Sequence, residues 1–81
     1  MPRGKPPFAA ARRWIWRASK ARDIDRRVWY DPVTDREYER DPTPEKGTWH
    51  EIDWQRRRYR ELDPDTGQPV DGSEGRWREL R

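Results

Sequence analysis

Apolar residues recur every three or four positions near the start of the chain. From Phe8 to about Arg22 the sequence contains no Gly or Pro and is rich in Ala and Arg, which both favour helix. Pro6 and Pro7 precede this stretch, and proline suits the first turn of a helix. The spacing predicts an amphipathic helix. Its apolar face would comprise Phe8, Ala11, Trp14, Ile15, Ala18 and Ala21.

The opposite face of this predicted helix is almost wholly cationic. It comprises Arg12, Arg13, Trp16, Arg17 and Lys20, and no carboxylate precedes Asp23. Three arrangements are open. The apolar face packs on the rest of the chain, which is the leading expectation. Alternatively, the five residues bind nucleic acid or a partner, with Trp16 stacking on a base, or the helix lies on an anionic membrane.

After Asp25 the pattern changes to strand-like runs, and one turn motif occurs twice. Residues 27–30 and 36–40 flank Asp-Pro-Val-Thr-Asp at 31–35, and residues 57–62 and 68–70 flank Asp-Pro-Asp-Thr-Gly at 63–67. In such a turn the Asp side chain accepts from the backbone, Pro fixes φ near about −65°, and the last residue is left-handed. Gly67 and Asp35 both tolerate that conformation. The two copies therefore predict two hairpins.

Further strands are predicted around these hairpins. Residues 41–47 are a Pro-containing loop, residues 48–54 alternate as a strand, and residues 76–80 can form a last short strand. The predicted fold class is α+β: an N-terminal amphipathic helix plus a small twisted antiparallel sheet of two hairpins and one or two extra strands. We expect a basic N-terminal arm and helix over residues 1–25 and a small antiparallel β body over residues 26–81. The core candidates are Trp29, Tyr38, Trp49 or Trp54, Tyr59, Leu62, Val70 and Trp77.

Composition limits the kinds of site that the chain can build. Of its 81 residues, 43% are charged and 30% are hydrophobic, and it has six Trp, one His and no Cys. Without Cys there is neither a disulfide nor a thiolate metal site, and the single His50 excludes a zinc site with several imidazoles. No apolar run approaches the ~20 residues of a membrane-spanning helix. We expect no metal, no small-molecule cofactor and no transmembrane segment.

The formal charge of +3 is unevenly distributed along the chain. Residues 1–30 hold nine Lys/Arg and two Asp, a charge of +7, whereas residues 31–81 hold ten Lys/Arg and fourteen Asp/Glu, a charge of −4. A basic arm on an acidic body suits an anionic partner such as RNA, a phospholipid surface or an acidic protein. It suits equally an arm that docks on its own body.

The order of several residues along the body resembles a known family. Trp29, the run Tyr38-Glu39-x-Asp41, Gly47, Asp53 and the run Glu-Leu-Asp-Pro-Asp-Thr-Gly at 61–67 are similar to the cytotoxic ribonuclease domain of the ribosome-cutting colicins and of polymorphic toxins. The resemblance covers about Trp29 to Arg76. It implies a small curved antiparallel sheet that cleaves ribosomal RNA with an Asp, a His, a Glu and an Arg. The first hairpin also resembles the tyrosine-aspartate repeats of toxin shells.

The resemblance implies site residues, with two departures. Asp41 matches the family's Asp and Arg76 falls near its Arg. Lys46 stands where the family has its His, and His50 stands where it has its Glu. The acidic charge of residues 31–81 also differs from the strongly basic family domain.

RNA cleavage through the 2′-hydroxyl needs a base, an acid and a cation beside the phosphate. The candidate catalytic set is Asp41, Lys46, His50 and Arg76, and it requires the 41–47 loop to fold over the face that carries His50. The alternative is that His50 is an ordinary strand histidine.

A second basic run gives further candidate binding residues. Strand alternation would place Arg56, Arg58 and Arg60 on one face, at a spacing of ~6.6–6.8 Å that suits successive RNA phosphates. The favoured alternative is a row of cross-strand pairs with Glu37, Glu39 or Glu51.

Two functional hypotheses follow. The first is a small RNA- or ribosome-directed toxin-like domain, either a metal-independent endoribonuclease or a catalytically degenerate relative. The second is a non-enzymatic accessory or structural subunit of a virion or nucleoprotein particle. Its basic arm and tryptophans would anchor it to an acidic protein surface of the assembly. Under either hypothesis we expect a soluble protein, cytoplasmic or virion-associated.

Overall fold

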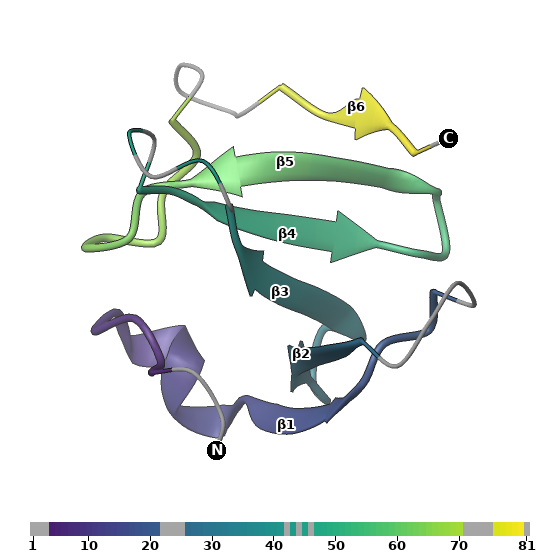
Figure 1. The fold of residues 1–81 in the computed structure, drawn as a ribbon, viewed down its shortest axis with the longest axis horizontal. Helices are drawn as coiled ribbons and strands as arrows, with labels where there is room; N and C mark the ends of the chain where they lie inside the picture. The colour runs from purple at the N-terminus through teal and green to yellow at the C-terminus, as the bar shows by residue number, and fades with distance from the viewer. Residues whose placement is uncertain are drawn as a thin grey trace.

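The structure, a computed structural model, describes residues 4–21, 26–41, 43, 45, 47–70 and 76–80. They form one six-stranded antiparallel sheet in which each strand pairs with its neighbours in sequence order. The elements are a 3₁₀ helix at Ala9–Arg13, β1 at Ile15–Ala18, β2 at Arg27–Asp31, β3 at Arg36–Arg40, β4 at Trp49–Asp53, β5 at Arg58–Leu62 and β6 at Arg78–Glu79. Figure 1 shows the strong twist of this sheet, with β1 and β2 turned away from β4, β5 and β6. No helix in the described ranges is long and apolar enough to cross a membrane.

The antiparallel sheet and the first hairpin of the prediction are confirmed. Trp29 on β2 lies opposite Tyr38 on β3. In the turn between them Asp31 accepts a hydrogen bond from the backbone amide of Val33 at 2.9 Å. Asp35 takes the left-handed conformation with φ 57°. The turn chemistry that the sequence indicates is therefore present.

The second predicted turn also forms, but the strand after it does not. Asp63 accepts from the backbone amide of Asp65 at 2.8 Å, and Gly67 has φ 75°. Beyond the turn only one isolated bridge, between Leu62 and Pro69, joins the returning chain to β5. The main partner of β5 is instead β4, across a turn at residues 54–57. In that turn Arg57 is left-handed with φ 52°, and no Gly or Pro marks it.

The predicted N-terminal amphipathic helix is wrong. Residues 9–13 form only a short 3₁₀ helix, and residues 15–18 form the edge strand β1, whose Trp16 pairs with Trp29 of β2. A helix would direct Trp14 and Trp16 to opposite faces, whereas extended chain directs alternate residues to one face. Here Trp14 is 2% exposed and Trp16 packs against the same core. Ile15, which was predicted to lie on the apolar face of the helix, is 49% exposed.

One face of the sheet carries the aromatic core. Trp14 stacks on Tyr38 with ring centroids 4.1 Å apart and an interplanar angle of 15°, and it lies 5.7 Å from Trp49. The buried cluster comprises Ala11, Trp14, Trp29, Tyr38, Trp49 and Leu62, with Phe8 and Trp16 packed against it. Of the other core candidates, Trp54, Tyr59 and Trp77 are half-buried and Val70 is 41% exposed. The N-terminal segment thus supplies part of the core.

Buried carboxylates fasten this segment to the sheet. Glu37 is fully buried, and it accepts hydrogen bonds of 2.6 Å from the Ser19 hydroxyl and from the Lys20 backbone amide. Asp31, also fully buried, accepts a 2.7 Å hydrogen bond from Arg13. Charged side chains that are buried in this way need such partners. These contacts place the basic N-terminal residues on the chain's own body.

The close approach of Phe8 to Gly67 gives a first prediction. A Cβ on Gly67 would lie 2.8 Å from the Phe8 ring, whereas a Cβ on Gly47, also left-handed, would meet only the flexible end of Arg40 at 3.5 Å. Gly47→Ala and Gly67→Ala should each lose about 1–2 kcal/mol for an L-residue in that conformation. Gly67→Ala should lose about 1–3 kcal/mol more, because Phe8 must move. Urea unfolding of both variants measures the difference, and equal losses would contradict the packing of Phe8 on this turn.

The two hydrogen bonds to Glu37 give a second prediction. In Glu37→Gln one carboxylate oxygen becomes an amide nitrogen. That nitrogen cannot accept a hydrogen bond, so the one from either Ser19 or Lys20 is lost. We expect a loss of about 1–3 kcal/mol in the free energy of unfolding and faster amide hydrogen exchange along β1. Glu45→Gln is the matched control, because Glu45 is exposed and its charge is removed in the same way. Equal stability of the two variants would show that Glu37 does not hold the N-terminal segment.

Candidate functional site

Asp41, His50 and Glu61 meet at one corner of the sheet. Asp41 directly follows β3, His50 lies on β4 and Glu61 lies on β5. His50 is opposite Glu39 on one side and opposite Glu61 on the other, so its side chain shares a face with both. The backbone amide of Asp41 donates to the carbonyl of Thr48 at 2.9 Å, which closes the loop between β3 and β4 and brings Asp41 to this corner.

The imidazole lies between two carboxylates. His50 Nε2 is 2.8 Å from Asp41 Oδ2 and 3.9 Å from Glu61 Oε1. The Thr48 hydroxyl donates a hydrogen bond to Glu61 Oε1 at 2.8 Å and so holds this carboxylate in place. The Asp41 side chain is 5% exposed, whereas that of His50 is 22% exposed. Both carboxylates therefore approach the imidazole at Nε2, and the ring remains partly exposed to solvent.

The local backbone keeps Asp41 ionised. The amide of Thr43 donates to Asp41 Oδ1 at 2.7 Å. This hydrogen bond is the main cause of a lowered pKa of Asp41. Burial acts in the opposite direction and raises the pKa of Asp41, whereas a hydrogen bond from the Thr43 side chain and the charge of His50 lower this pKa further. A carboxylate held in this way orients the imidazole instead of exchanging a proton with solvent.

The same three side chains offer donors of the kind that bind a divalent cation. One ligand atom from each of Asp41, His50 and Glu61 lies within 4.8 Å of the others. One imidazole and two carboxylate oxygens suit Zn²⁺ or Mn²⁺. The present contact of 2.8 Å between His50 and Asp41 is that of a direct ion pair or hydrogen bond, so the arrangement also stands without a metal.

Of the four predicted catalytic residues, the structure brings two together. Asp41 and His50 are in contact, as folding of the 41–47 loop onto the His50 face requires. Lys46 lies outside the described residues. Arg76 is exposed and lies two residues before β6. Glu61 was not predicted, although the pairing of 50 with 61 follows once a four-residue turn at 54–57 is placed between β4 and β5.

Most cations predicted to bind RNA or a partner instead contact the chain itself. Arg13 pairs with Asp31 and Lys20 with Asp35. Arg17 lies 3.9 Å over the Tyr30 ring.

The predicted phosphate-binding row is also engaged. Arg56 and Arg58 lie 3.4 and 3.5 Å from Asp53, and Arg60 donates to Glu51 at 2.6 Å. Cross-strand pairing, the favoured alternative for this row, therefore describes the contact of Arg60. Arg12 is exposed.

A buried ionic cluster, missed from the sequence, occupies the core face. Glu51, 5% exposed, accepts hydrogen bonds from Tyr38 at 2.6 Å, Arg60 at 2.6 Å and Arg36 at 3.3 Å. Burial, together with the charge of Glu51, raises the pKa of Tyr38. Trp77 covers the guanidinium groups, 4.3 Å from Arg60 and 5.3 Å from Arg36. Three donors within the cluster therefore satisfy the Glu51 carboxylate, which indicates a structural role.

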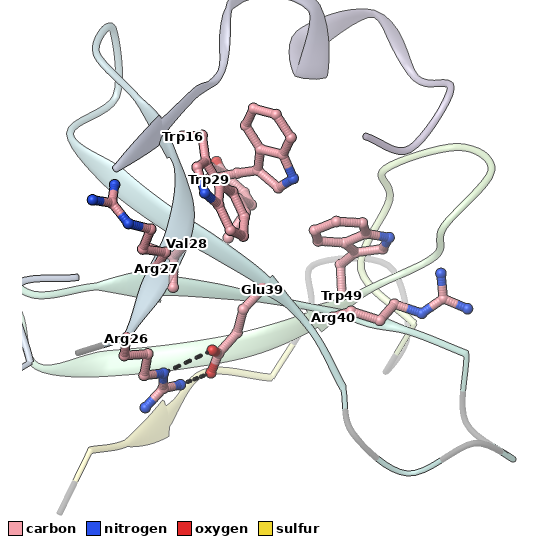
Figure 2. Close-up of a pocket in the computed structure, with 9 residues that line it drawn as sticks. Trp16, Arg26, Arg27, Val28, Trp29, Glu39, Arg40 and Trp49 are labelled. Atoms are coloured by element: carbon pink, nitrogen blue, oxygen red, sulfur yellow. Dashed lines mark hydrogen bonds and ion pairs between the residues drawn. The ribbon is translucent and has the colours of Figure 1, made fainter. Parts of the chain in front are cut away.

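A cavity of about 330 Å³ opens at the same end of the sheet as His50. Its lining consists of Trp16, Arg26, Arg27, Val28, Trp29, Tyr38, Glu39, Arg40 and Trp49. Figure 2 shows the indole of Trp49 across an open space from those of Trp16 and Trp29, with Arg40 on one side and Arg26 and Arg27 on the other. Glu39 both lines this cavity and lies opposite His50. The cavity and the His50 corner are therefore adjacent.

Comparison with known proteins identifies no relative. No protein-family model matches the sequence, and neither a curated protein nor a solved structure matches it significantly.

The lowered carboxyl pKa values predict how stability depends on pH. Burial raises the pKa of Asp53, but hydrogen bonds from Arg56 outweigh it, and the pKa of Asp53 is lowered, as is that of Asp41. Hydrogen bonds from Tyr30 and Lys20 lower the pKa of Asp35 to about 2. A carboxyl with a lower pKa in the folded than in the unfolded chain stabilises above its unfolded value, about 3.9, and this stabilisation is lost as the pH falls through the folded value.

We therefore expect the free energy of unfolding to be nearly constant from pH 7 to about 5 and to fall steeply between about pH 4 and 2. Urea unfolding followed by tryptophan fluorescence at a series of pH values measures it. In Asp53→Asn the fall should be shallower. A stability that rises on acidification would contradict these contacts.

Proposed function

We propose that this chain is a small RNA-directed endoribonuclease of the toxin type, which cleaves an unpaired segment of RNA without a metal ion. The observation that carries the proposal is the corner at which His50 Nε2 lies 2.8 Å from Asp41 and 3.9 Å from Glu61. General acid–base catalysis needs groups within hydrogen-bond reach of the same reacting atoms, about 2.6–3.2 Å or one water away. The His50 imidazole, whose side chain is 22% exposed, shares one face of the sheet with the nearly buried Glu61 carboxylate, and the two together supply an acid and a base.

The three side chains have distinct roles in this reaction. Glu61 accepts the proton of a ribose 2′-hydroxyl while the ribose 2′-oxygen forms a bond to the adjacent phosphorus. The bond from phosphorus to the 5′-oxygen breaks, and protonated His50 gives its proton to that oxygen. The products are a 2′,3′-cyclic phosphate and a 5′-hydroxyl. Asp41, which its lowered pKa keeps anionic, holds the imidazole in position.

Cations beside this corner offset the charge of its carboxylates. Arg26 donates to Glu39 through both Nε and Nη2, so the carboxylate opposite His50 is already neutralised. Arg40 directly precedes Asp41, and its guanidinium lies near Gly47 in the segment that leads into β4. An arginine there suits a phosphate next to the one that is cleaved. This supply is modest, and we expect a low affinity for phosphate alone.

The resemblance to the ribosome-cutting colicins supports the choice of RNA as substrate. It implies a curved antiparallel sheet, and a strongly twisted antiparallel sheet is the fold of this chain. The Asp that it carries over, Asp41, belongs to the corner. The roles nevertheless differ from the family's pattern, because the imidazole comes from His50 and the added carboxylate from Glu61. The alternative of an accessory subunit relied on a basic helical arm as an anchor, and that segment is engaged with its own body.

Cleavage assays test the proposal directly. Ribosomes and an unstructured RNA incubated with the purified chain should yield discrete fragments that end in 2′,3′-cyclic phosphate. His50→Gln and Glu61→Gln should each lower the cleavage rate by about 10²–10⁴-fold, because neither amide exchanges a proton. Asp65→Asn is the control: Asp65 is an exposed carboxylate in the turn after β5, and its loss should leave the rate unchanged.

The same assay distinguishes a metal-independent reaction from one that needs a divalent cation. Cleavage should persist in excess chelator, and Zn²⁺ should inhibit it by occupying the donors of Asp41, His50 and Glu61. A folded wild-type chain that leaves both RNAs intact would refute the proposal. Wild-type rates in both folded variants would also refute it.

A further inference from the structure

We infer that the cavity beside the His50 corner is a nucleotide subsite, which takes one unpaired RNA base against Trp16 and the flanking phosphates on Arg27 and Arg40. The inference rests on the proposed function, since it names how the same corner would recognise its RNA. It also makes a claim of its own, because binding at the cavity is measurable without cleavage.

The walls of the cavity offer aromatic rings of the kind on which bases stack. Trp16, Trp29 and Trp49 come from three different strands, and Trp16 meets Trp29 edge to face at 5.1 Å and 63°. Tyr38 is stacked on Trp14 on its other side, which makes the wall rigid. Trp16 is half-buried and lies on the edge strand. It is therefore the indole that an entering base reaches most easily, and stacking of this kind is worth about 1–3 kcal/mol per base.

The charges at the rim of the cavity suit phosphate. Across the part of the chain that the structure describes, neither Arg27 nor Arg40 makes a side-chain hydrogen bond or ion pair, and both are exposed. This contrasts with Arg13, Arg58 and Arg60, which carboxylates already hold. Figure 2 shows the guanidinium groups of Arg27 and Arg40 on opposite sides of the aromatic wall. A base between them would have one phosphate on each side.

The size and position of the cavity suit a single nucleotide next to the cleaved bond. Its volume of about 330 Å³ lies at the lower end of the range of small-ligand sites, about 300–1,000 Å³. Arg40 and Trp49 both line the cavity and pair with each other across β3 and β4. Arg40 directly precedes Asp41, and Trp49 directly precedes His50. Because consecutive strand residues face opposite sides, an RNA chain passing round this strand end would present a base to the cavity and the next phosphate to His50.

Equilibrium binding tests the subsite without relying on cleavage. The probe is a short unstructured oligoribonucleotide with 2′-O-methyl groups, which cannot be cut, and tryptophan fluorescence or fluorescence anisotropy gives the dissociation constant. Trp16→Ala should weaken binding by about 5- to 100-fold, as expected for one stacked base, and Trp16→Phe should restore most of it. Arg27→Ala and Arg40→Ala should each weaken binding several-fold and reduce its salt dependence.

Arg57→Ala is the matched control, because Arg57 is exposed, lies in the turn at residues 54–57 and is outside the cavity lining. It should change binding by less than Arg27→Ala. An abasic oligonucleotide with the same phosphates separates stacking from charge: it should bind weakly, and Trp16→Ala should not weaken it further. Thermal unfolding of each variant shows that it is folded.

The outcomes separate the subsite from the reaction. If the wild type cleaves RNA but Trp16→Ala, Arg27→Ala and Arg40→Ala all bind the probe as tightly as Arg57→Ala, the subsite is refuted and the catalytic corner stands. If the probe binds as described but no RNA is cut, the catalytic proposal fails and a nucleotide-binding site remains. Equal affinity for the abasic and the normal oligonucleotide would also refute the subsite.

Discussion

The structure depends on pairing the carboxylates that this small sheet buries. Within the described ranges six carboxylate residues are at most 9% exposed: Asp31, Glu37, Asp41, Glu51, Asp53 and Glu61. A buried charge is costly unless hydrogen bonds and opposite charges compensate it. The hydroxyl, amide and guanidinium groups that compensate these six come largely from segments distant in sequence. Their pairing therefore specifies the arrangement of the strands, together with an aromatic core that is small for the length of the chain.

The same pairing decides which cations remain for a ligand. On the core face Glu51 and Asp53 engage Arg58 and Arg60, which the sequence alone would assign to phosphate binding. On the N-terminal segment Arg13 reaches Asp31. Among the described cations of this segment, Arg13, Lys20 and Arg26 are thus paired with carboxylates of the chain itself. The proposed RNA site accordingly combines the arginines at the cavity with the corner where Asp41 and Glu61 approach His50.

Local turn chemistry made the first hairpin and the second turn predictable, whereas the pairing of β4 with β5 and the N-terminal segment were not. Asp35 and Gly67 occupy the left-handed positions that their motif indicates, and the alternation of residues 48–54 assigns Trp49 and His50 to opposite faces correctly. The helix prediction failed because its periodicity ignored tertiary context. Trp14 and Trp16 gain more from burial against one sheet face, as alternate residues of an extended chain, than helix propensity offers.

The candidate site was predictable only in part. Asp41 and His50 came from a family resemblance and from the rarity of histidine in the chain. Glu61 depends on the register between β4 and β5, which an unmarked turn with a left-handed Arg57 sets. Whether Arg27 and Arg40 find a carboxylate among the described residues depends on where the other arginines bind theirs, and no local pattern encodes that.

We propose that RNA binds round the strand end between the tryptophan cavity and His50. A crystal structure of the chain with an oligoribonucleotide blocked by one 2′-deoxy group at the cut site tests this most directly. It should show a base against Trp16 and the adjacent phosphate within hydrogen-bond reach of His50. RNA seated instead on the face of Arg56, Arg58 and Trp77, with the His50 corner unoccupied, would contradict the account.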